Sequence, residues 1–446
     1  MEAFATGDLL RIVPFINMLP KPCVNLLHLL LLSSLLASFT TSANQWSQFH
    51  GNAERTGRSP VAGPMGPPTL AWKTQVGCLH WGPGCWIPGF TGTDSSPALS
   101  PDGSTVFIGS YDHNLYAVSA LNGTVLWKTF TGSSGIGIES SPAVTPHNIV
   151  IVGTYSKKII GCSGESGAVL WTYPTSNYVA SAPALSLGGD IAFVGGVDGL
   201  LHAIFTSNGK RKWIYNASIV VEQGGALSLQ SIWAPPMVSD DVVFFGSGGQ
   251  ANPYVDAHAH VHALNSSDGS TLWNYSVGSS QIQSCPTLGR GNKTLFVGVY
   301  DGRLLALDAH NGTLLWTTKT GGRVESSPVT YMTESSANGT SGGSRSMEVE
   351  VVAVGSADGY VYAFHVETGV MVWRTKIGDE VGSSPAVDKD GRLYIGGDPG
   401  VWCLNGTSGK VLWSYPTKGL IGSSPALDLK GGLIVGGEDG YLMKIV

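Results

Sequence analysis

The sequence predicts an all-β protein, an eight-bladed β-propeller built from four-stranded antiparallel blades. Its 446 residues include 61 Gly and 13 Trp, and only 13% of them are charged. This composition is typical of chains rich in turns and aromatic side chains rather than in helices. A long segment recurs eight times with the same order of parts, and such internal repeats are the signature of propellers and related folds. Each copy carries short apolar runs separated by turn residues, which favours a meander.

Turn residues and prolines define the strands of each copy. Asp-Gly separates the second run from the third in "YDGRL" and "ADGYV", and Asn-Gly separates the third from the fourth in "LNGTVLW" and "HNGTLLW". These pairs suit the positive φ values of tight hairpins. Each first run contains a proline, and because proline cannot donate to a β-ladder, we expect this run at a sheet edge. Eight short sheets with one compact edge each favour radial packing around a channel. The copies begin near Ser95, Ser140, Ser181, Trp233, Ser284, Ser326, Ser383 and Ser423. The prolines are Pro97, Pro142, Pro183, Pro235, Pro286, Pro328, Pro385 and Pro425.

The eighth copy is incomplete, and a segment near the N-terminus completes it. This copy stops at Val446 after three runs, whereas "TLAWKTQVG", residues 69–77, resembles a fourth run without upstream partners. We therefore expect residues 69–77 to close the ring as the last strand of the last blade. Each blade then has one Trp, to which we assign a structural role between sheets. These residues are Trp72, Trp127, Trp171, Trp213, Trp273, Trp316, Trp373 and Trp413.

Residues 1–45 are predicted to be a targeting segment that precedes a single propeller domain, residues 46–446. "NLLHLLLLSSLLASF", residues 25–39, has the length of a signal-peptide core, and "TSA" at 41–43 offers small residues for cleavage. Translation from Met18 gives a more ordinary signal length. The alternative is an uncleaved anchor. We expect a secreted protein or one in the lumen of the secretory pathway.

Cysteines and glycosylation sequons fit this route. Cys78 and Cys85 bracket a short loop that a disulfide could close, whereas Cys162, Cys285 and Cys403 fall in different blades and are expected to be buried and free. Sequons support an N-glycosylated product, although the fold itself favours some of the Asn-Gly-Thr turns. They lie at Asn122, Asn216, Asn265, Asn274, Asn292, Asn311, Asn338 and Asn405.

The repeat resembles the pyrroloquinoline-quinone (PQQ) repeat of quinoprotein alcohol dehydrogenase-like propellers. The resemblance rests on "VGVYDGRLLALDAHNGTLLWTT" and on the opening "WSQFHGNAERTG", residues 46–57, and it covers residues 46–446. It implies a propeller and, in the enzymes, PQQ held beneath adjacent cysteines with calcium below it. This chain has no adjacent cysteine pair. The family also includes non-enzymatic members such as the bacterial outer-membrane assembly lipoprotein BamB, so the fold alone does not assign chemistry.

The residue before each Ser-Ser-Pro-like element is the best candidate for a site at the channel. Asp94, Glu139 and Glu325 supply carboxylates, Gln283 supplies an amide, and Arg323 lies two residues before Glu325, on the same strand face. Oxygen ligands suit calcium, and in a dehydrogenase Glu139 or Asp94 could act as base while Arg323 stabilises the quinone anion. The other interpretation is a water-filled channel that tolerates polar side chains. The full ring is Asp94, Glu139, Ala180, Ile232, Gln283, Glu325, Gly382 and Gly422.

A second constellation is "DAHAHVHAL". Alternation along a strand places Asp256, His258, His260 and His262 on one face, where zinc or copper could bind. Neighbours on that face are about 6.5 to 7 Å apart, which is wide for one ion. The favoured interpretation is structural.

The sequence thus favours a secreted, monomeric binding or scaffold module with a protein partner or small ligand at the channel. The alternative is a PQQ- and calcium-dependent alcohol or sugar dehydrogenase. The net charge of −6 gives no basic surface for nucleic acid, and no membrane span is expected in the mature chain.

Overall fold

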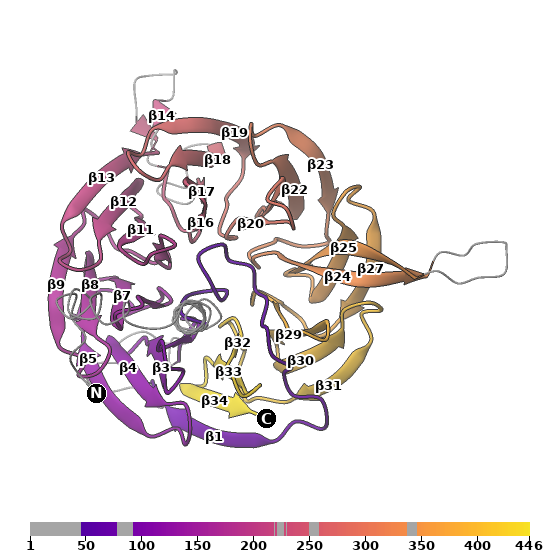
Figure 1. Ribbon diagram of the computed structural model, residues 1–446, viewed down its shortest axis with the longest axis horizontal. Coiled ribbons are helices and arrows are strands. Elements are labelled where there is room, and N and C mark those ends of the chain that lie inside the picture. The colour runs from indigo at the N-terminus through magenta and orange to yellow at the C-terminus, as the bar shows by residue number, and fades with distance from the viewer. Residues whose placement is uncertain are drawn as a thin grey trace, which may run out of the picture. The chain divides into compact units, whose positions relative to one another are not determined.

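The computed structural model describes residues 46–77, 92–217, 219–220, 227–228, 230–248, 258–336 and 346–446. The chain forms two units, residues 1–44 and residues 45–446, and only the second is described here. In this unit eight four-stranded antiparallel sheets are arranged around a ring (Figure 1). The prediction of an all-β, eight-bladed propeller is confirmed. No helix in the described part of the chain is long and apolar enough to cross a membrane.

In blades one to four the chain runs from the innermost strand outward. Blade one contains β2 (Ala98–Leu99), β3 (Thr105–Gly109), β4 (Asn114–Ser119) and β5 (Val125–Phe130). Blade two contains β6 (Ala143–Val144), β7 (Ile149–Thr154), β8 (Lys158–Ser163) and β9 (Val169–Pro174). Blade three contains β10 (Ala184–Leu185), β11 (Ile191–Gly195), β12 (Leu200–Phe205) and β13 (Arg211–Asn216). A small hairpin of β14 (Ile219–Val220) and β15 (Leu227–Ser228) follows. Blade four contains β16 (Met237–Ser239), β17 (Val242–Ser247), β18 (His258–Asn265) and β19 (Thr271–Ser279).

Blades five to eight repeat this order. Blade five contains β20 (Thr287–Leu288), β21 (Thr294–Gly298), β22 (Arg303–Asp308) and β23 (Leu314–Lys319). Blade six contains β24 (Val329–Ser336), β25 (Ser346–Gly355), β26 (Tyr360–His365) and β27 (Met371–Lys376). Its hairpin of β24 and β25 extends outward from the ring (Figure 1). Blade seven contains β28 (Ala386–Val387), β29 (Arg392–Gly397), β30 (Gly400–Asn405) and β31 (Val411–Tyr415). Blade eight contains β32 (Ala426–Leu427), β33 (Leu433–Gly436), β34 (Tyr441–Ile445) and β1 (Leu70–Gln75).

The ring is closed by β1, as the sequence predicts. This strand pairs antiparallel with β34, with Trp72 opposite Lys444. Thr69 and Val446 exchange two backbone hydrogen bonds of 2.9 Å beyond the ends of the two strands. The last blade therefore joins both ends of the propeller, and its sheet ties residues that are more than 370 positions apart.

The Trp side chains join neighbouring blades at the outer strands. The indole of Trp72 donates to the carbonyl of Ala120 at 3.2 Å, in the turn that precedes β5. A Cβ on Gly123 in that turn would lie 2.9 Å from the indole ring. Gly123 also has a φ of 75°. Both the close approach of the indole ring and this backbone conformation therefore require glycine at the position. Six other indoles donate to carbonyls of a following segment, and Trp413 donates to the carbonyl of Pro64 near the N-terminus. These contacts support a structural role for all eight.

Two local expectations are corrected. The repeat prolines precede the short inner strands rather than lie within them, and in blade four the residue before β16 is Pro236, not Pro235. The Asn-Gly connections are also longer than a tight two-residue hairpin. In blade one, residues 120–124 join β4 to β5, and only Gly123 in this connection has a positive φ.

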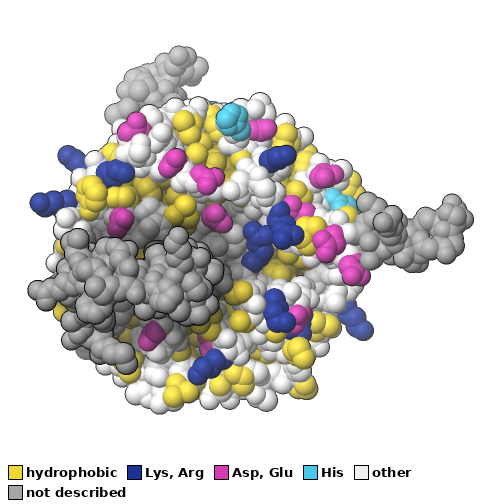
Figure 2. Space-filling view, viewed as in Figure 1, with side chains coloured by type: hydrophobic (Ala, Val, Ile, Leu, Met, Phe, Trp, Pro, Cys, Tyr) yellow, Lys and Arg dark blue, Asp and Glu magenta, His cyan; other side chains and the backbone are white. Residues whose placement is uncertain are grey.

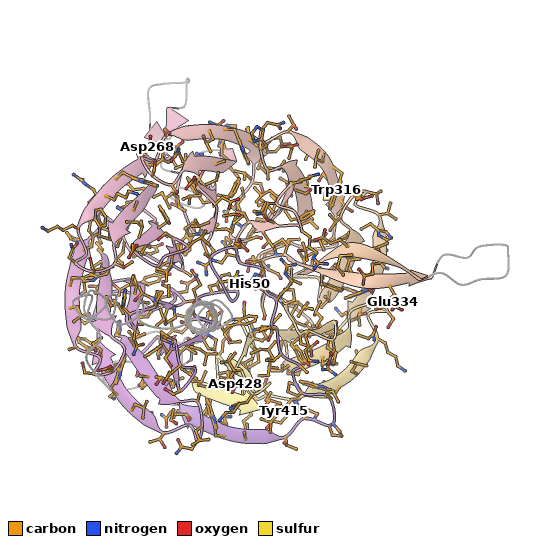
Figure 3. The ribbon with its side chains drawn as sticks, in the orientation of Figure 1. His50, Asp268, Trp316, Glu334, Tyr415 and Asp428 are labelled. Atoms are coloured by element: carbon orange, nitrogen blue, oxygen red, sulfur yellow. The ribbon has the colours of Figure 1, made fainter. Side chains whose placement is uncertain are left out.

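Residues 46–59, which we call the axial segment, cross the centre of the ring (Figure 1). Backbone NH groups of four inner strands donate to its carbonyl oxygens at 2.7 to 2.9 Å. The pairs are Leu99 with Trp46, Val144 with Ser47, Val238 with Ala53 and Val387 with Gly57. His50 lies near the middle of the ring in Figure 3, and its two ring nitrogens each lie 2.8 Å from a backbone carbonyl oxygen. Burial lowers the pKa of His50 to about 4, and the two carbonyl contacts oppose this effect.

Arg55 anchors the axial segment to blades three and four. The side chain is fully buried. Its guanidinium donates to the carbonyl of Phe49 within the segment, to Pro183 before β10 at 2.6 Å and to Pro236 before β16 at 3.1 Å. Burial lowers its pKa to about 10, which leaves the group charged at neutral pH. A buried cation is tolerated here because carbonyl oxygens surround it.

Candidate functional site

A cavity of about 160 Å³ lies above the axial segment, at the axis of the propeller. Phe49 of the axial segment contributes to its lining. The remaining walls come from loops that lead into the eight inner strands, so each blade contributes residues at an equivalent place. The ring of residues that line it is Asp94, Glu139, Ala180, Trp233, Gln283, Glu325, Gly382 and Gly422.

The structure brings four of the five candidate residues into one cavity, whereas Arg323 does not line it. Asp94, Glu139, Gln283 and Glu325 all line it. In blade four Trp233 takes the expected place of Ile232, which is fully buried away from the cavity. The predicted position is wrong by one residue because "WAPPM" contains two consecutive prolines, and only the second directly precedes β16.

Serine side chains fix these loops at the same depth. The backbone NH of Ser96 donates to the hydroxyl of Ser141 in the next blade at 2.8 Å. The same bond joins Ser327 to Ser384, Ser384 to Ser424 and Ser424 to Ser96, at 2.8 to 2.9 Å. The last of these closes the ring between blades eight and one. Because each cavity residue lies two positions before its serine, the serines set where the carboxylates stand.

Tyrosine hydroxyls hold the carboxylates of Asp94 and Glu139. Tyr111 donates to Asp94 and Tyr155 donates to Glu139, each at 2.5 Å. Burial raises the pKa of Asp94, and the bond from Tyr111 offsets part of that effect. Burial raises the pKa of Glu139 to about 7, opposed by the bond from Tyr155 and reinforced by the charges of Asp94 and Glu325. The sequence prediction did not include these tyrosines, although both follow a strand in the repeated pattern Gly-x-Tyr.

One oxygen of Asp94 lacks a partner. Its Oδ1 atom is buried and accepts no hydrogen bond within the described residues. A Cβ built on Gly422 would lie 2.5 Å from this atom, so only glycine leaves room for the carboxylate there. Gly382 likewise adds no side chain between Glu325 and Gly422. The two glycines open the cavity on the side between blades six and one.

An aromatic wall faces the carboxylates from blades two to four. The rings of Tyr155 and Tyr178 stack with centroids 4.4 Å apart and planes at 10°. Tyr178 in turn meets Trp233 edge-on at 5.7 Å. Trp233 lines the cavity, as Glu139 does, so the lining combines an aromatic side chain with carboxylates.

Arg323 is engaged by carboxylates. Its Nε donates to Glu325 at 2.6 Å, and a terminal nitrogen donates to Glu380. The guanidinium also lies over the ring of Tyr300, 5.6 Å from its centroid. Arg323 and Glu325 belong to the loop before β24 rather than to a strand, which corrects the expected strand face. The cavity therefore carries more negative than positive charge.

This donor set does not fit an anionic quinone. PQQ carries carboxylates of its own, which the three carboxylates of the cavity would repel, and Arg323 is already paired. Within the described residues, no group of three or more His, Cys, Asp or Glu side chains is arranged to hold a metal ion. Asp94, Glu139 and Glu325 share one cavity without forming such a group. The cysteines placed by the structure, Cys162, Cys285 and Cys403, are buried and free, as expected.

Of the three histidines of β18, His262 takes a structural position. His262 is buried, stacks on Phe245 with centroids 4.6 Å apart and lies 2.8 Å from the hydroxyl of Ser247. Burial lowers its pKa to about 3. His258 is exposed, and Nδ1 of His260 lies 3.0 Å from the carbonyl oxygen of His258. Asp256 of the possible metal site, and Cys78 and Cys85 of the expected disulfide, lie outside the described residues.

On the face drawn in Figure 2, acidic, basic and hydrophobic side chains are interspersed over the blades. Binding faces for nucleic acid instead gather Lys and Arg along one tract.

Comparison with known proteins places the chain in a family. The family model described as outer membrane protein assembly factor BamB matches residues 43–260, 257–335 and 357–445. BamB of Yersinia pestis is 26% identical over 303 residues, which cover 66% of this chain and 67% of the relative. The beta-alanine-activating enzyme of Drosophila melanogaster is 27% identical over 250 residues, which cover 52% of this chain and 23% of that protein.

Solved structures share the fold. BamB from Moraxella catarrhalis matches with a TM-score of 0.61 and 18% identity, covering 85% of this chain and 99% of that chain. The quinohemoprotein alcohol dehydrogenase from Comamonas testosteroni matches with a TM-score of 0.68 and 12% identity, covering 91% of this chain and 81% of that chain. At these identities the likeness to solved structures concerns the fold alone. The match of the family model over most of the chain shows that this protein belongs to the BamB-like family of PQQ-repeat propellers.

Proposed function

We propose that this protein is a secreted binding or scaffold module whose central cavity receives a partner. The observation that carries the proposal is the form of the cavity, a recess at the propeller axis that ends on Phe49 of the axial segment. A recess lined by carboxylates and aromatic side chains is suited to hold a protruding group. Relatives in the same family are named assembly factors, which also supports a binding or scaffold role.

The alternative function is a PQQ- and calcium-dependent dehydrogenase. In that enzyme Glu139 or Asp94 would remove a proton from the alcohol, and Arg323 would stabilise the anionic quinone. The contacts favour the binding role, because Arg323 is held by Glu325 and Glu380 and is not directed at a free anion. Dye reduction by the purified protein with added PQQ and calcium separates the two functions.

We expect no saturable quinone absorbance and no dye reduction with primary alcohols or aldoses. Quinone binding together with dye reduction, both abolished in Glu325→Ala and Arg323→Ala, would move the protein among the dehydrogenases. The exposed variant Glu334→Gln, on the β24 hairpin far from the axis in Figure 3, controls for a general effect of lost charge.

Partner binding is tested by affinity capture from the secretory compartment or the medium, with the native protein and a Glu139→Gln variant in parallel. A partner that is retained by the native protein and by Glu334→Gln, and lost from Glu139→Gln, is the expected result. Partners that are captured equally by all three proteins would place binding elsewhere on the ring and contradict a role for the cavity.

The secretory route is part of the proposal. The expected mature chain begins near Asn44, carries N-glycans and has a disulfide between Cys78 and Cys85. Intact-mass measurements before and after glycosidase and reductant test each part. A cytosolic, unmodified chain that begins at Met1 would contradict it. Sequon asparagines that the structure places at exposed positions are Asn122, Asn216, Asn274, Asn292 and Asn311, whereas Asn265 and Asn405 are half-buried and Asn338 lies outside the described residues.

A further inference from the structure

We propose that the central cavity recognises an organic cation, an alkylammonium or guanidinium group, with its charge toward Asp94 and Glu139 and its carbon chain against Trp233. This inference rests on the proposed binding function and names the chemistry of its ligand. Three features of the cavity support the proposal: its charge, an unpaired oxygen of Asp94, and the aromatic side chain in its lining.

The first observation is the balance of charge. Asp94, Glu139 and Glu325 line the cavity. Arg323 pairs with Glu325 and with Glu380, which does not line the cavity. Glu139 and Asp94 receive hydrogen bonds only from neutral tyrosines in the contacts of the structure. A ligand that brings a positive charge therefore relieves repulsion between these carboxylates, whereas an anion increases it.

The second observation is independent of the first. Oδ1 of Asp94 is buried and accepts no hydrogen bond within the described part of the chain. A buried acceptor without a donor costs free energy comparable to a lost hydrogen bond. An ammonium group offers three donors and a guanidinium offers five. The atom packs against Gly422, so a turn of the Asp94 carboxylate toward the cavity would let an N–H donor of the ligand satisfy the oxygen and pair with its charge.

The third observation selects an organic cation over a bare metal ion. Trp233 lines the cavity, and Tyr178 and Tyr155 pack behind one another against it through ring contacts. Aromatic faces attract ammonium and guanidinium groups and pack against their carbon chains. A calcium ion instead needs six to eight oxygen ligands around one point, and the described carboxylates do not form such a group.

The cation has two possible sources, a free amine or a Lys or Arg side chain of a partner. Isothermal titration calorimetry with n-butylamine tests the free form. Titration with the capped peptide acetyl-Gly-Lys-Gly-amide, beside its Nε-acetylated form, tests the side chain. Butan-1-ol and n-butyrate have the same carbon chain without a positive charge, so they control for apolar binding.

We expect saturable binding of n-butylamine or of the lysine peptide, and none of butan-1-ol, butyrate or the acetylated peptide. Glu139→Gln and Asp94→Asn keep the shape of the side chains and should each weaken binding about tenfold or more, the effect of one lost charged hydrogen bond. Glu334→Gln should bind like the native protein. Cooperative thermal unfolding at melting temperatures no lower than that of the native protein shows that the variants remain folded.

The outcomes separate the two sources and the two proposals. Tighter binding of the peptide than of n-butylamine identifies a basic side chain of a partner, and the reverse identifies a small amine. No saturable binding of either cation up to about 10 mM, a free energy weaker than about 3 kcal/mol, would overturn the cation proposal. Equal affinity of the native protein and of Glu139→Gln for either cation would also overturn the cation proposal. If a captured partner still depends on Glu139 in that case, the binding function stands and only the ligand class is wrong.

Discussion

Replacing Trp72 by Ala tests whether β1 closes the ring. Trp72 is buried between blade eight and blade one, and its indole donates to Ala120. Truncation of a buried Trp costs about 3 to 5 kcal/mol. The unit has roughly 400 residues, and an unfolding entropy of about 2.1 cal/mol/K per residue gives about 0.8 kcal/mol/K, so the melting temperature should fall by about 4 to 6 °C.

The matched control is Trp316→Ala, measured by scanning calorimetry under the same conditions. Trp316, labelled in Figure 3, takes the equivalent place between blades five and six, and its indole donates to Val366 at 2.8 Å. These two blades are consecutive in the chain, so this contact does not depend on closure by the N-terminal strand. Similar losses in both variants are the expected result. A normal melting temperature for Trp72→Ala beside a clear loss for Trp316→Ala would refute the closure by β1.

Three further changes test other parts of the structure. Removal of residues up to Gly77 should expose the edge of β34 and cause aggregation; a stable monomer by light scattering would contradict this. Arg55→Met should cost about 3 kcal/mol or more in denaturant unfolding, because buried carbonyls lose their donor; an unchanged midpoint would show that Arg55 does not anchor the axial segment. Glu139→Gln should be more stable than the native protein at pH 8 by about 1 to 3 kcal/mol and equal to it near pH 4. The sign follows because the pKa of Glu139 is raised from 4.5 to about 7, so stability from the protonated group is lost as pH rises through this window. Equal stabilities at pH 8 would contradict the raised pKa.

The propeller could be predicted because its signals are local and repeated. Asp-Gly and Gly-x-Val-Leu-Trp elements recur in register, and the missing fourth strand of the last copy pointed directly to residues 69–77. The Trp residues could be assigned to packing because one falls in each blade. Such regularity makes each copy an independent test of the others.

The axial segment could not be predicted in the same way. Residues 46–59 have no strand period, and their partners are backbone groups of inner strands that no residue identity marks. Arg55 forms its bonds with carbonyl oxygens, which every residue carries. The sequence offered one weak signal, an isolated Arg in a segment that also contains Trp46 and Phe49.

The candidate site was predicted in part. Equivalent positions of a repeat lie around one axis, so Asp94 and Glu139 could be placed together from spacing alone. The aromatic wall was missed because the double proline shifted Trp233 by one residue. The pairing of Arg323 with Glu380 could not be read from spacing, since the two residues are 57 positions apart and come from different loops.

The central claim, that the cavity is a receptor for a positively charged group, is tested most directly by the titration of Glu139. Carbon-13 NMR of Glu-labelled protein, assigned with Glu139→Gln, measures its pKa with and without n-butylamine. The structure predicts a pKa of about 7 in the free protein, raised by burial. On saturation with the amine this pKa should fall by about one unit or more, because a nearby positive charge favours the carboxylate. A pKa near 4.5 in the free protein that n-butylamine does not move would contradict the claim.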